Sequence, residues 1–287
     1  MKESDELLVG AHLSIAGGVH RALERGRDAG CRAVQMFLKN SNQWEAKPLT
    51  DQDRELFAAR RRDGGIVAVV AHGSYLINLA SPDDALWQKS LDAFVEELRR
   101  AQFLDIPHLV LHPGAHKGAG VDAGVMRTAD ALNRAFDQTA PAVTVLLETM
   151  AGQGSSLGSR FEELAAILEK IEDADRVGVC LDTSHIFAAG YDIRTRETYD
   201  ATMDEFDRLI GIGRIRVVHV NDSRKELASR VDRHFHIGEG RIGLDAFSFI
   251  VNDPRLAAVP KILETPKGDD GEEDLRNLAT LRSLYKG

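Results

Sequence analysis

Eight short apolar runs, separated by segments with helical spacing, constrain the fold of this 287-residue chain more than any other feature. Each run is rich in β-forming residues and is a predicted strand. The segment from Asp84 to Phe103 is typical of the predicted helices, because its apolar residues share one broad face. Farther along, Ser159 and Glu162 are spaced as a capping box that would begin another helix. The predicted strands are Leu7–Ala11, Ala33–Phe37, Ile66–Ala71, Leu109–Leu111, Val143–Leu147, Val177–Leu181, Ile215–Val220 and Lys261–Leu263.

The alternation of strand and helix predicts an α/β fold with a parallel sheet and right-handed crossovers. Eight such units in a chain slightly longer than about 250 residues favour a single (β/α)8 TIM barrel. An open, doubly wound sheet stays an alternative, because periodicity does not reveal closure. Glycine and proline are scattered singly and no linker is evident, so one domain is expected over residues 1–287.

Histidines and carboxylates stand where the predicted strands end. His72, His112, Glu148, Asp182 and Glu264 each follow such a strand, and barrel enzymes place their chemistry at the C-terminal face of the strands. Two short loops add paired ligands, Asp182 with His185 and Asp232 with His234, and His219 completes the set. A lone histidine is more often structural, and Asp182 could simply cap a helix. Taken together, however, imidazole and carboxylate without thiolate predict a multinuclear zinc or manganese site.

The remaining histidines are interpreted as structural or surface groups, although two of them lie near the same mouth. These five residues are His12, His20, His108, His116 and His236.

Composition narrows the class of protein. Two cysteines, Cys31 and Cys180, give no disulfide framework or cysteine-rich metal site. The N-terminus lacks the pattern of a signal peptide, and no apolar run reaches the length of a membrane span, so a cytoplasmic protein without membrane association is expected. A formal net charge of −9 argues against a general polyanion binder. Binding to metal ions would cancel the negative charge of four of the carboxylates.

Two motif matches are discounted. Gly238-Glu-Gly240-Arg-Ile-Gly243 fits the dinucleotide fingerprint but follows a polar loop, so it is interpreted as a loop in which the backbone approaches another group closely. Gly154-Ser-Ser156-Leu-Gly158 fits the nucleophile elbow of serine hydrolases, but Ser156 comes well after the nearest strand.

Eleven segments, in order along nearly the whole chain, resemble the endonuclease IV family. They are Gly10-Ala-His-Leu-Ser14, Phe37-Leu-Lys-Asn40, His72-Gly-Ser-Tyr-Leu-Ile-Asn-Leu79, His112-Pro-Gly-Ala-His116, Glu148-Thr-Met-Ala-Gly-Gln-Gly154, Leu181-Asp-Thr-Ser-His185 with Ala188-Ala-Gly-Tyr-Asp192, His219-Val-Asn-Asp222, Val231-Asp-Arg-His234 with Gly238-Glu-Gly240, and Leu263-Glu-Thr265.

This resemblance implies a deoxyribonuclease IV, that is, a zinc-dependent apurinic/apyrimidinic (AP) endonuclease of base excision repair. Such an enzyme is a phosphodiesterase that cuts duplex DNA on the 5′ side of an abasic site and leaves a 3′-hydroxyl and a 5′-deoxyribose phosphate. It implies three Zn²⁺ ions, with Mn²⁺ possible in one or more sites, and a metal-bound hydroxide as nucleophile. No organic cofactor is implied, and a monomer is expected.

The resemblance also assigns the metal ligands. Glu148 would be catalytic and bridge two ions. His72 and His112 would complete the first site, Asp182, His219 and Glu264 the second, and His185, Asp232 and His234 would form the third.

Residues in the loops would recognise the lesion. By the resemblance, Tyr75 and Leu76 enter the minor groove and help to flip the abasic nucleotide, whereas their sequence alone favours a place in the core. Asn42 departs from the pattern, since some family members have arginine there. The residues expected to contact DNA are Tyr75, Leu76, Lys39, Asn40, Asn42 and Arg233.

Two other functions are compatible with parts of the pattern. A sugar isomerase or epimerase on a related barrel would use Glu148, Asp182, His219 and Glu264 with one or two metals, but it has no need of the other ligands. A non-catalytic DNA-damage binder could use zinc only to hold its loops.

Overall fold

Eight parallel strands close into a barrel in the computed structural model, which describes residues 7–268 and 271–287. The hydrogen-bonded order around the barrel is β1-β10-β7-β6-β5-β4-β3-β2. The predicted (β/α)8 TIM barrel is therefore confirmed, and the open-sheet alternative is wrong. The barrel strands are β1 (Val9–His12), β2 (Ala33–Phe37), β3 (Ala68–His72), β4 (His108–Leu111), β5 (Thr144–Glu148), β6 (Val177–Asp182), β7 (Ile215–His219) and β10 (Lys261–Leu263).

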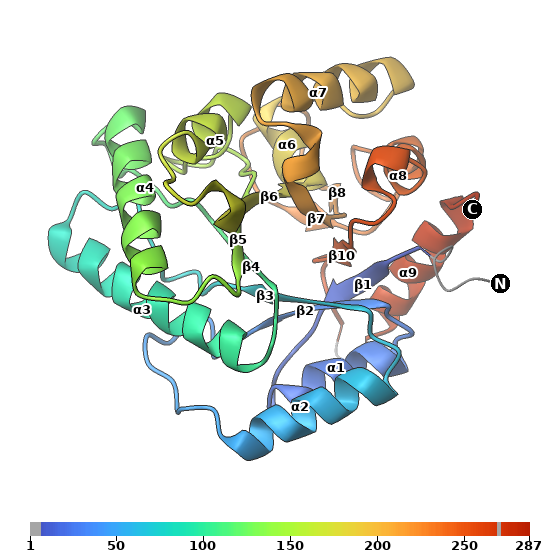
Figure 1. Ribbon diagram of the computed structural model, residues 1–287. Coiled ribbons are helices and arrows are strands. Elements are labelled where there is room, and N and C mark those ends of the chain that lie inside the picture. The colour runs from blue at the N-terminus through green and yellow to red at the C-terminus, as the bar shows by residue number, and fades with distance from the viewer. Residues whose placement is uncertain (1–6, 269–270) are drawn as a thin grey trace.

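Helices surround the strands as an outer ring, and β1 lies beside β10 where the barrel closes (Figure 1). A two-stranded antiparallel ribbon, β8 (Asp222–Ser223) with β9 (His234–Phe235), stands outside the barrel sheet. Of the helices in the described part of the chain, none has both the length and the apolar character needed to cross a membrane. The helices are α1 (His20–Asp28), α2 (Asp51–Asp63), α3 (Asp84–Phe103), α4 (Val121–Asp137), α5 (Phe161–Leu168), α6 (Thr183–Ala189), α7 (Arg196–Leu209), α8 (Leu244–Val251) and α9 (Glu272–Leu284), with 3-10 turns η2 (Ala174–Arg176), η3 (Ile212–Arg214) and η4 (Pro254–Leu256).

Local sequence explains where these helices begin. The α3 helix has the predicted bounds, and Asp83 caps it by accepting a 2.8 Å hydrogen bond from the backbone N–H of Leu86. The predicted capping box of Ser159 and Glu162 is wrong by one residue. Glu163 makes these contacts instead, because its carboxylate accepts hydrogen bonds from the backbone N–H groups of residues 158, 159 and 160.

The inside of the barrel is built in layers. Successive side chains of a strand point to opposite faces, so every second residue points inward. One small apolar cluster is separate from the main core between sheet and helices, and its strand residues are Ala33, Val70, Val110, Leu146, Cys180, Val217 and Ile262. The corresponding position of β1 is Gly10, where a Cβ atom would lie 1.5 Å from the carbonyl oxygen of Ala33. This layer forms an apolar floor.

Two residues farther along each strand, the inward-facing layer becomes polar. The alternation that builds the floor therefore directs one polar side chain per strand into the C-terminal mouth of the barrel. This polar layer consists of His12, Gln35, His72, His112, Glu148, Asp182, His219 and Glu264.

Candidate metal centre

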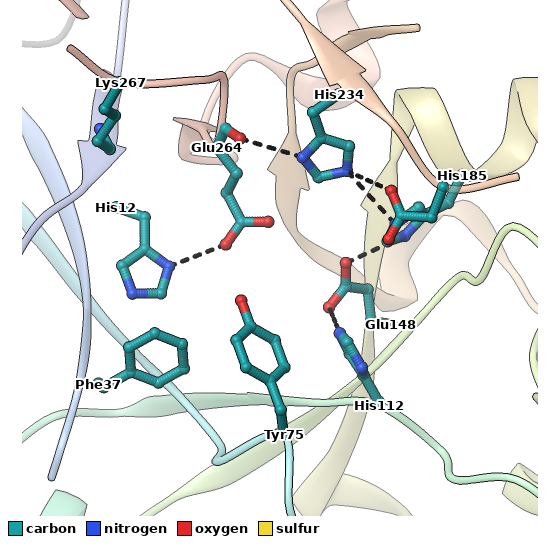
Figure 2. A pocket seen from close by; sticks show the side chains of 10 residues that line it. His12, Phe37, Tyr75, His112, Glu148, His185, His234, Glu264 and Lys267 are labelled. Carbon is teal, nitrogen blue, oxygen red and sulfur yellow. Dashed lines mark hydrogen bonds and ion pairs between the residues drawn. The ribbon is translucent and has the colours of Figure 1, made fainter. Parts of the chain in front are cut away.

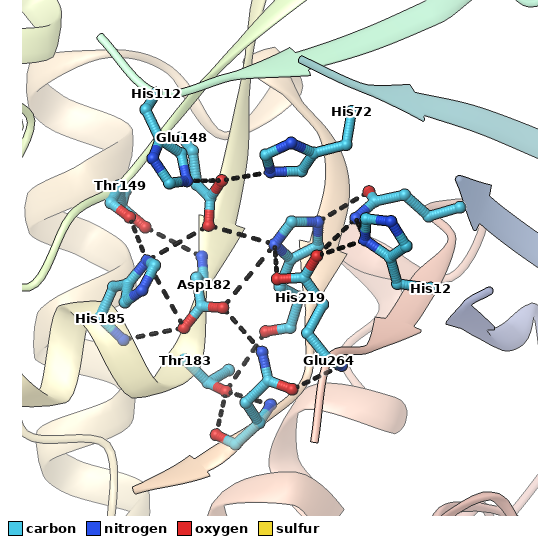
Figure 3. A network of polar contacts seen from close by, with 12 residues as sticks. His12, His72, His112, Glu148, Thr149, Asp182, Thr183, His185, His219 and Glu264 are labelled. Atoms are coloured by element: carbon cyan, nitrogen blue, oxygen red, sulfur yellow. Dashed lines mark hydrogen bonds and ion pairs between the residues drawn. The ribbon is translucent and has the colours of Figure 1, made fainter. Parts of the chain in front are cut away.

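Three groups of potential ligands adjoin one another in the polar layer and the loops above it. Figure 2 labels His234 beside His185, and Figure 3 labels the other members. Within each group the ligand atoms all lie within 4.8 Å of one another. Neighbouring groups share a carboxylate, so the whole cluster is continuous. The groups are His72 with His112 and Glu148; Glu148 with Asp182, His219 and Glu264; and Asp182 with His185 and His234.

Glu148 occupies the centre of the cluster at the end of β5. Its Oε2 lies 3.3 Å from Nε2 of His72 and 3.1 Å from Nε2 of His112. Its Oε1 lies 3.2 Å from Nδ1 of both His185 and His219. Each oxygen therefore faces a different side of the cluster, which is the arrangement that a bridging carboxylate requires.

Backbone carbonyls orient several of the histidines. Nδ1 of His72 lies 2.8 Å from the carbonyl oxygen of Gly73, and Nδ1 of His185 lies 2.8 Å from that of Thr149. Nδ1 of His234 is 3.1 Å from the carbonyl oxygen of Glu264. A carbonyl only accepts hydrogen bonds, so each Nδ1 must carry the proton, and Nε2 keeps its lone pair for a metal.

His219 is oriented the opposite way by a side chain. Its Nε2 lies 2.8 Å from the amide oxygen of Gln35, so this nitrogen donates and Nδ1 keeps the lone pair. That Nδ1 faces Glu148 and is also 3.2 Å from Oε2 of Glu264. The unprotonated ring nitrogens and the carboxylate oxygens thus point toward one another. Nitrogen and oxygen ligands of this kind suit zinc or manganese.

Asp232, a loop residue expected to bind metal, also lies close to the third group. Its carboxylate is 3.2 Å from Nε2 of His185 and 3.4 Å from Nε2 of His234, and these two nitrogens are 3.4 Å apart. The three residues expected to hold one ion are therefore brought together, with Asp182 beside them.

The carboxylates of the cluster are fixed in place. Asp182 caps α6 by accepting a 2.8 Å hydrogen bond from the backbone N–H of His185, so the expected capping role and a place in the cluster coexist. Its other oxygen accepts from the side-chain amide of Asn221 at 2.7 Å. Burial alone would raise the pKa of Glu148, but the neighbouring imidazoles of His219 and His112 outweigh burial and hold this pKa well below its usual range. Glu148 therefore stays a carboxylate.

Two polar residues in this layer have roles that the sequence reasoning missed. Nδ1 of His12 lies 2.9 Å from Oε1 of Glu264, and the amide nitrogen of Gln35 donates to the same oxygen at 2.7 Å. They therefore hold Glu264 in place, and Gln35 also orients His219. The period of two along each strand was the available signal, because His12 and Gln35 occupy the same layer as the ligands.

A cavity of about 430 Å³ opens over the cluster, within the usual range for small-ligand sites (Figure 2). Tyr75 points its hydroxyl into this cavity, between Glu148 and Glu264. The residue is 56% exposed, so its interpretation as a core residue is wrong. Its ring lies 5.6 Å from that of His112, while Leu76 is only partly buried.

The other residues expected to contact DNA differ in accessibility. Asn40, Asn42 and Arg233 are exposed. Lys39, in contrast, is buried, and its ammonium donates to the backbone carbonyls of Gln43 at 3.0 Å and Trp44 at 2.7 Å. The expectation that Lys39 contacts DNA is corrected, since this ammonium faces inward and holds its own loop.

The glycine-rich loop discounted as a dinucleotide motif closes around Asp222. This carboxylate accepts hydrogen bonds from the backbone N–H groups of Gly238, Gly240 and Ile242 at 2.9 to 3.0 Å. A Cβ atom on Gly240 would lie 2.4 Å from Oδ1 of Asp222. The predicted close approach of the backbone is therefore confirmed, and the group approached is a carboxylate of the same chain.

Known proteins resemble this chain along nearly its full length. The family described as xylose isomerase-like TIM barrel matches residues 23–284. A probable endonuclease 4 of Chloroflexus aggregans is 55% identical over 96% of this chain and 97% of its own length, and that of Geobacter sulfurreducens is 52% identical over 97% and 94%. The solved endonuclease IV of Thermus thermophilus superposes with a TM-score of 0.85 at 38% identity, covering 96% of this chain and 98% of its own. A D-tagatose 3-epimerase-like protein, at 18% identity and a TM-score of 0.72, shares the fold.

Proposed function

Since this chain belongs to the endonuclease IV family, we propose that it hydrolyses the phosphodiester bond on the 5′ side of an abasic site in duplex DNA. It is an AP endonuclease that acts in DNA repair. The proposed products are a 3′-hydroxyl and a 5′-deoxyribose phosphate. The observation that carries the proposal is the continuous cluster of three ligand groups beneath an open cavity.

The proposed cofactors are three zinc ions, with manganese as an alternative in one or more sites. All nine ligands come from one chain, so we propose that a monomer is active. When bound, the ions would supply Lewis-acid chemistry, lowering the pKa of a water that attacks phosphorus and stabilising charge on the attacking and leaving oxygens. His72, His112 and Glu148 would hold the first ion, Glu148, Asp182, His219 and Glu264 the second, and His185, Asp232 and His234 the third.

The residues of the chain would position these ions and the phosphate. The four ligand carboxylates carry less charge than three divalent ions, so the loaded pocket is cationic although the formal net charge of the protein is −9. Glu148 would join the first two sites, because one of its oxygens faces His112 and the other faces His219. No side-chain nucleophile is needed.

The rim of the cavity is proposed to recognise the lesion. Tyr75 and Leu76 would enter the minor groove, and the exposed Asn40, Asn42 and Arg233 would contact the strand near the flipped nucleotide. An abasic nucleotide is less costly to extrude than a paired one, because it has no base to unpair and unstack. Asn42 would contribute a hydrogen bond without the charge of an arginine.

A sugar epimerase is the nearest alternative, since the barrel is shared with such enzymes. That chemistry would engage Glu148, Asp182, His219 and Glu264. It gives no reason for His72, His112 and Asp232 to converge on the same cluster. These additional ligands favour the nuclease.

The test is incision of an end-labelled duplex that carries one abasic analogue. Purified protein is assayed before and after chelation, and a polymerase is then offered the product. We expect chelator-sensitive incision, restored by zinc, with a 3′ end that the polymerase extends. A protein that holds three transition-metal ions but leaves the duplex intact would contradict the proposed function, and full activity with one ion would contradict the trinuclear site.

A further inference from the structure

We propose that Glu97, a buried carboxylate on α3, is a positioning residue that sets two loops of the cavity rim in the arrangement that binds DNA. The first, here called the β2 loop, comprises residues 39–47, and the second, the β3 loop, comprises residues 73–79. The inference rests on the proposed function, because these loops carry Asn40, Asn42, Tyr75 and Leu76. Glu97 itself touches none of the proposed ligands through a hydrogen bond or ion pair that the structure records.

Glu97 holds the β3 loop directly. Its oxygens accept hydrogen bonds from the backbone N–H of Ser74 at 3.2 and 3.3 Å, and the residue is 1% exposed. The hydroxyl of Ser74 donates to the carbonyl oxygen of Ser41 at 2.6 Å and accepts from the N–H of Leu76 at 3.3 Å. The residue immediately before Tyr75 is thereby fixed both to α3 and to the β2 loop.

Glu97 reaches the β2 loop through Lys39. The Lys39 ammonium lies 3.6 Å from Oε1 of Glu97, and both side chains are almost fully buried. The same ammonium donates to the backbone carbonyls of Gln43 and Trp44 at 3.0 and 2.7 Å. The Glu97 carboxylate therefore holds in place the Lys39 ammonium, which in turn binds the backbone in the middle of the β2 loop.

One turn farther along α3, Arg100 binds the backbone at both ends of the β2 loop, at Leu38 directly before it and at Lys47, its last residue. Its guanidinium donates to the carbonyl oxygen of Leu38 at 2.9 and 3.1 Å and to that of Lys47 at 2.9 Å. Residues three apart on a helix face the same side, so Glu97 and Arg100 form one supporting surface. The α3 helix thus supports both loops through charged side chains.

Core stability alone does not account for this pair. Burial raises the pKa of Glu97 to about 7, against the opposing charge of Lys39, so ionisation in this place is costly. Apolar residues of similar volume often stabilise a core as well as a buried ion pair or better. What they cannot do is direct hydrogen bonds to the backbone of two loops.

The experiment compares zinc-loaded wild type with Glu97→Gln, with the double variant Glu97→Gln/Lys39→Met, and with Glu169→Gln as the control. Glu169 lies directly after α5 and is exposed, and the structure records no ion pair between it and either loop. For each protein we would measure KM and kcat on the abasic duplex, hydrolysis of bis(p-nitrophenyl) phosphate, zinc content and Tm. The small diester reports on the metal site without using the loops.

We expect Glu97→Gln to raise KM about tenfold with kcat nearly unchanged, the pattern of lost uniform binding. Zinc content and hydrolysis of the small diester should stay at the wild-type level, and Glu169→Gln should match wild type throughout. In the double variant no unpaired ammonium is left buried, so Tm should recover at least in part. KM should remain high, because Lys39→Met removes the donor of the Gln43 and Trp44 carbonyls and Glu97→Gln removes the carboxylate.

The inference is overturned if KM returns together with Tm in the double variant, since Glu97 would then act only on stability. It is also overturned if hydrolysis of the small diester falls as much as incision of the duplex. Wild-type incision with an unchanged KM in Glu97→Gln refutes this inference alone. Absence of incision by wild type refutes the proposed function, and the inference falls with it.

Discussion

Individual residues in this protein combine structural and chemical tasks. Asp182 caps α6 and also faces the ligands of two groups. Gln35 orients His219 with its oxygen and Glu264 with its nitrogen. Such shared tasks mean that a substitution in the polar layer disturbs several ligands at once, because each partner fixes the tautomer or rotamer of the next.

Glu148→Gln tests the bridging carboxylate. Glutamine keeps the volume of the side chain but removes its charge and one acceptor oxygen. Loss of a residue that only supports a ligand costs roughly 10 to 100-fold in metal affinity or activity, and loss of the bridge should exceed that. We expect incision to fall beyond this range and zinc content to decrease, while the far-ultraviolet circular dichroism stays unchanged. Glu169→Gln, at an exposed position, is the control; unaltered incision by Glu148→Gln would disprove the bridging role.

Gly240→Ala tests the loop around Asp222. The added methyl group would lie 2.4 Å from Oδ1 of Asp222, so the loop must move, at a cost of roughly 1 to 3 kcal/mol. We expect a lower free energy of unfolding in urea and weaker binding of zinc, since the same segment carries Asp232 and His234. Gly213→Ala is the matched control, because a Cβ atom there meets no neighbour within 4 Å. Equal losses in both variants would show that the close approach has no consequence.

At the scale of elements, the barrel strands carry most of the proposed metal ligands, and the loops carry the residues proposed to contact DNA. His72, Glu148, Asp182 and His219 are the last residues of β3, β5, β6 and β7. Strand ends are held by the barrel hydrogen bonds, whereas the β2 and β3 loops depend on α3 for their support. Catalysis and DNA affinity should therefore respond to different substitutions.

Replacing Tyr75 and Leu76 together by alanine tests this separation. A side chain that stacks on or between bases contributes roughly 1 to 3 kcal/mol, so incision of intact duplex at low substrate should fall about 10 to 100-fold. Zinc content should not change, because neither side chain belongs to the ligand groups. Met126→Ala, which removes an apolar side chain of equal 56% exposure from α4, is the control. A duplex activity equal to wild type would exclude the wedge.

At the scale of the whole molecule, the barrel divides into a functional mouth and a stabilising base. The mouth gathers polar residues over the apolar floor, and the opposite end begins with residues such as Lys261, at the start of β10. Lys261 is fully buried and donates a hydrogen bond to the carbonyl of Leu256. The candidate metal ligands lie at the mouth, at the other end of the barrel from Lys261.

Lys261 gives this stability a pH dependence. Burial lowers its pKa to about 8 from the ordinary value of 10.5. Between these values the unfolded chain binds more protons than the folded one, so the free energy of unfolding rises with pH, by at most roughly 3 kcal/mol. We would compare urea unfolding of wild type and Lys261→Met at pH 8 and pH 10.5, so that other titrating groups cancel. The free energy of unfolding of wild type, relative to that of Lys261→Met, should be larger at pH 10.5 than at pH 8. The same relative value at both pH values would contradict the assignment to Lys261.

The sequence by itself determined the strand and helix order, the polar ends of the strands and the types of metal ligand. These follow from local rules: alternation with a period of two, helical spacing, and the chemistry of imidazole and carboxylate. Helix α3 was predicted with its bounds, and the boundary errors at β1, β3 and α5 amount to one or two residues.

Only the tertiary structure decided which of these residues meet. Closure of β1 against β10 joins the two ends of the chain and places His12 beside Glu264, 252 residues apart. Lys39 is buried, against the expectation that it contacts DNA. Tyr75 is exposed, against the interpretation from local pattern alone but in line with the place that the family resemblance implies. Orientation of the histidines depended on carbonyls and on Gln35, brought into place by packing. The physical reason is that burial, charge pairing and tautomer are set by contacts between distant segments, which no local pattern contains.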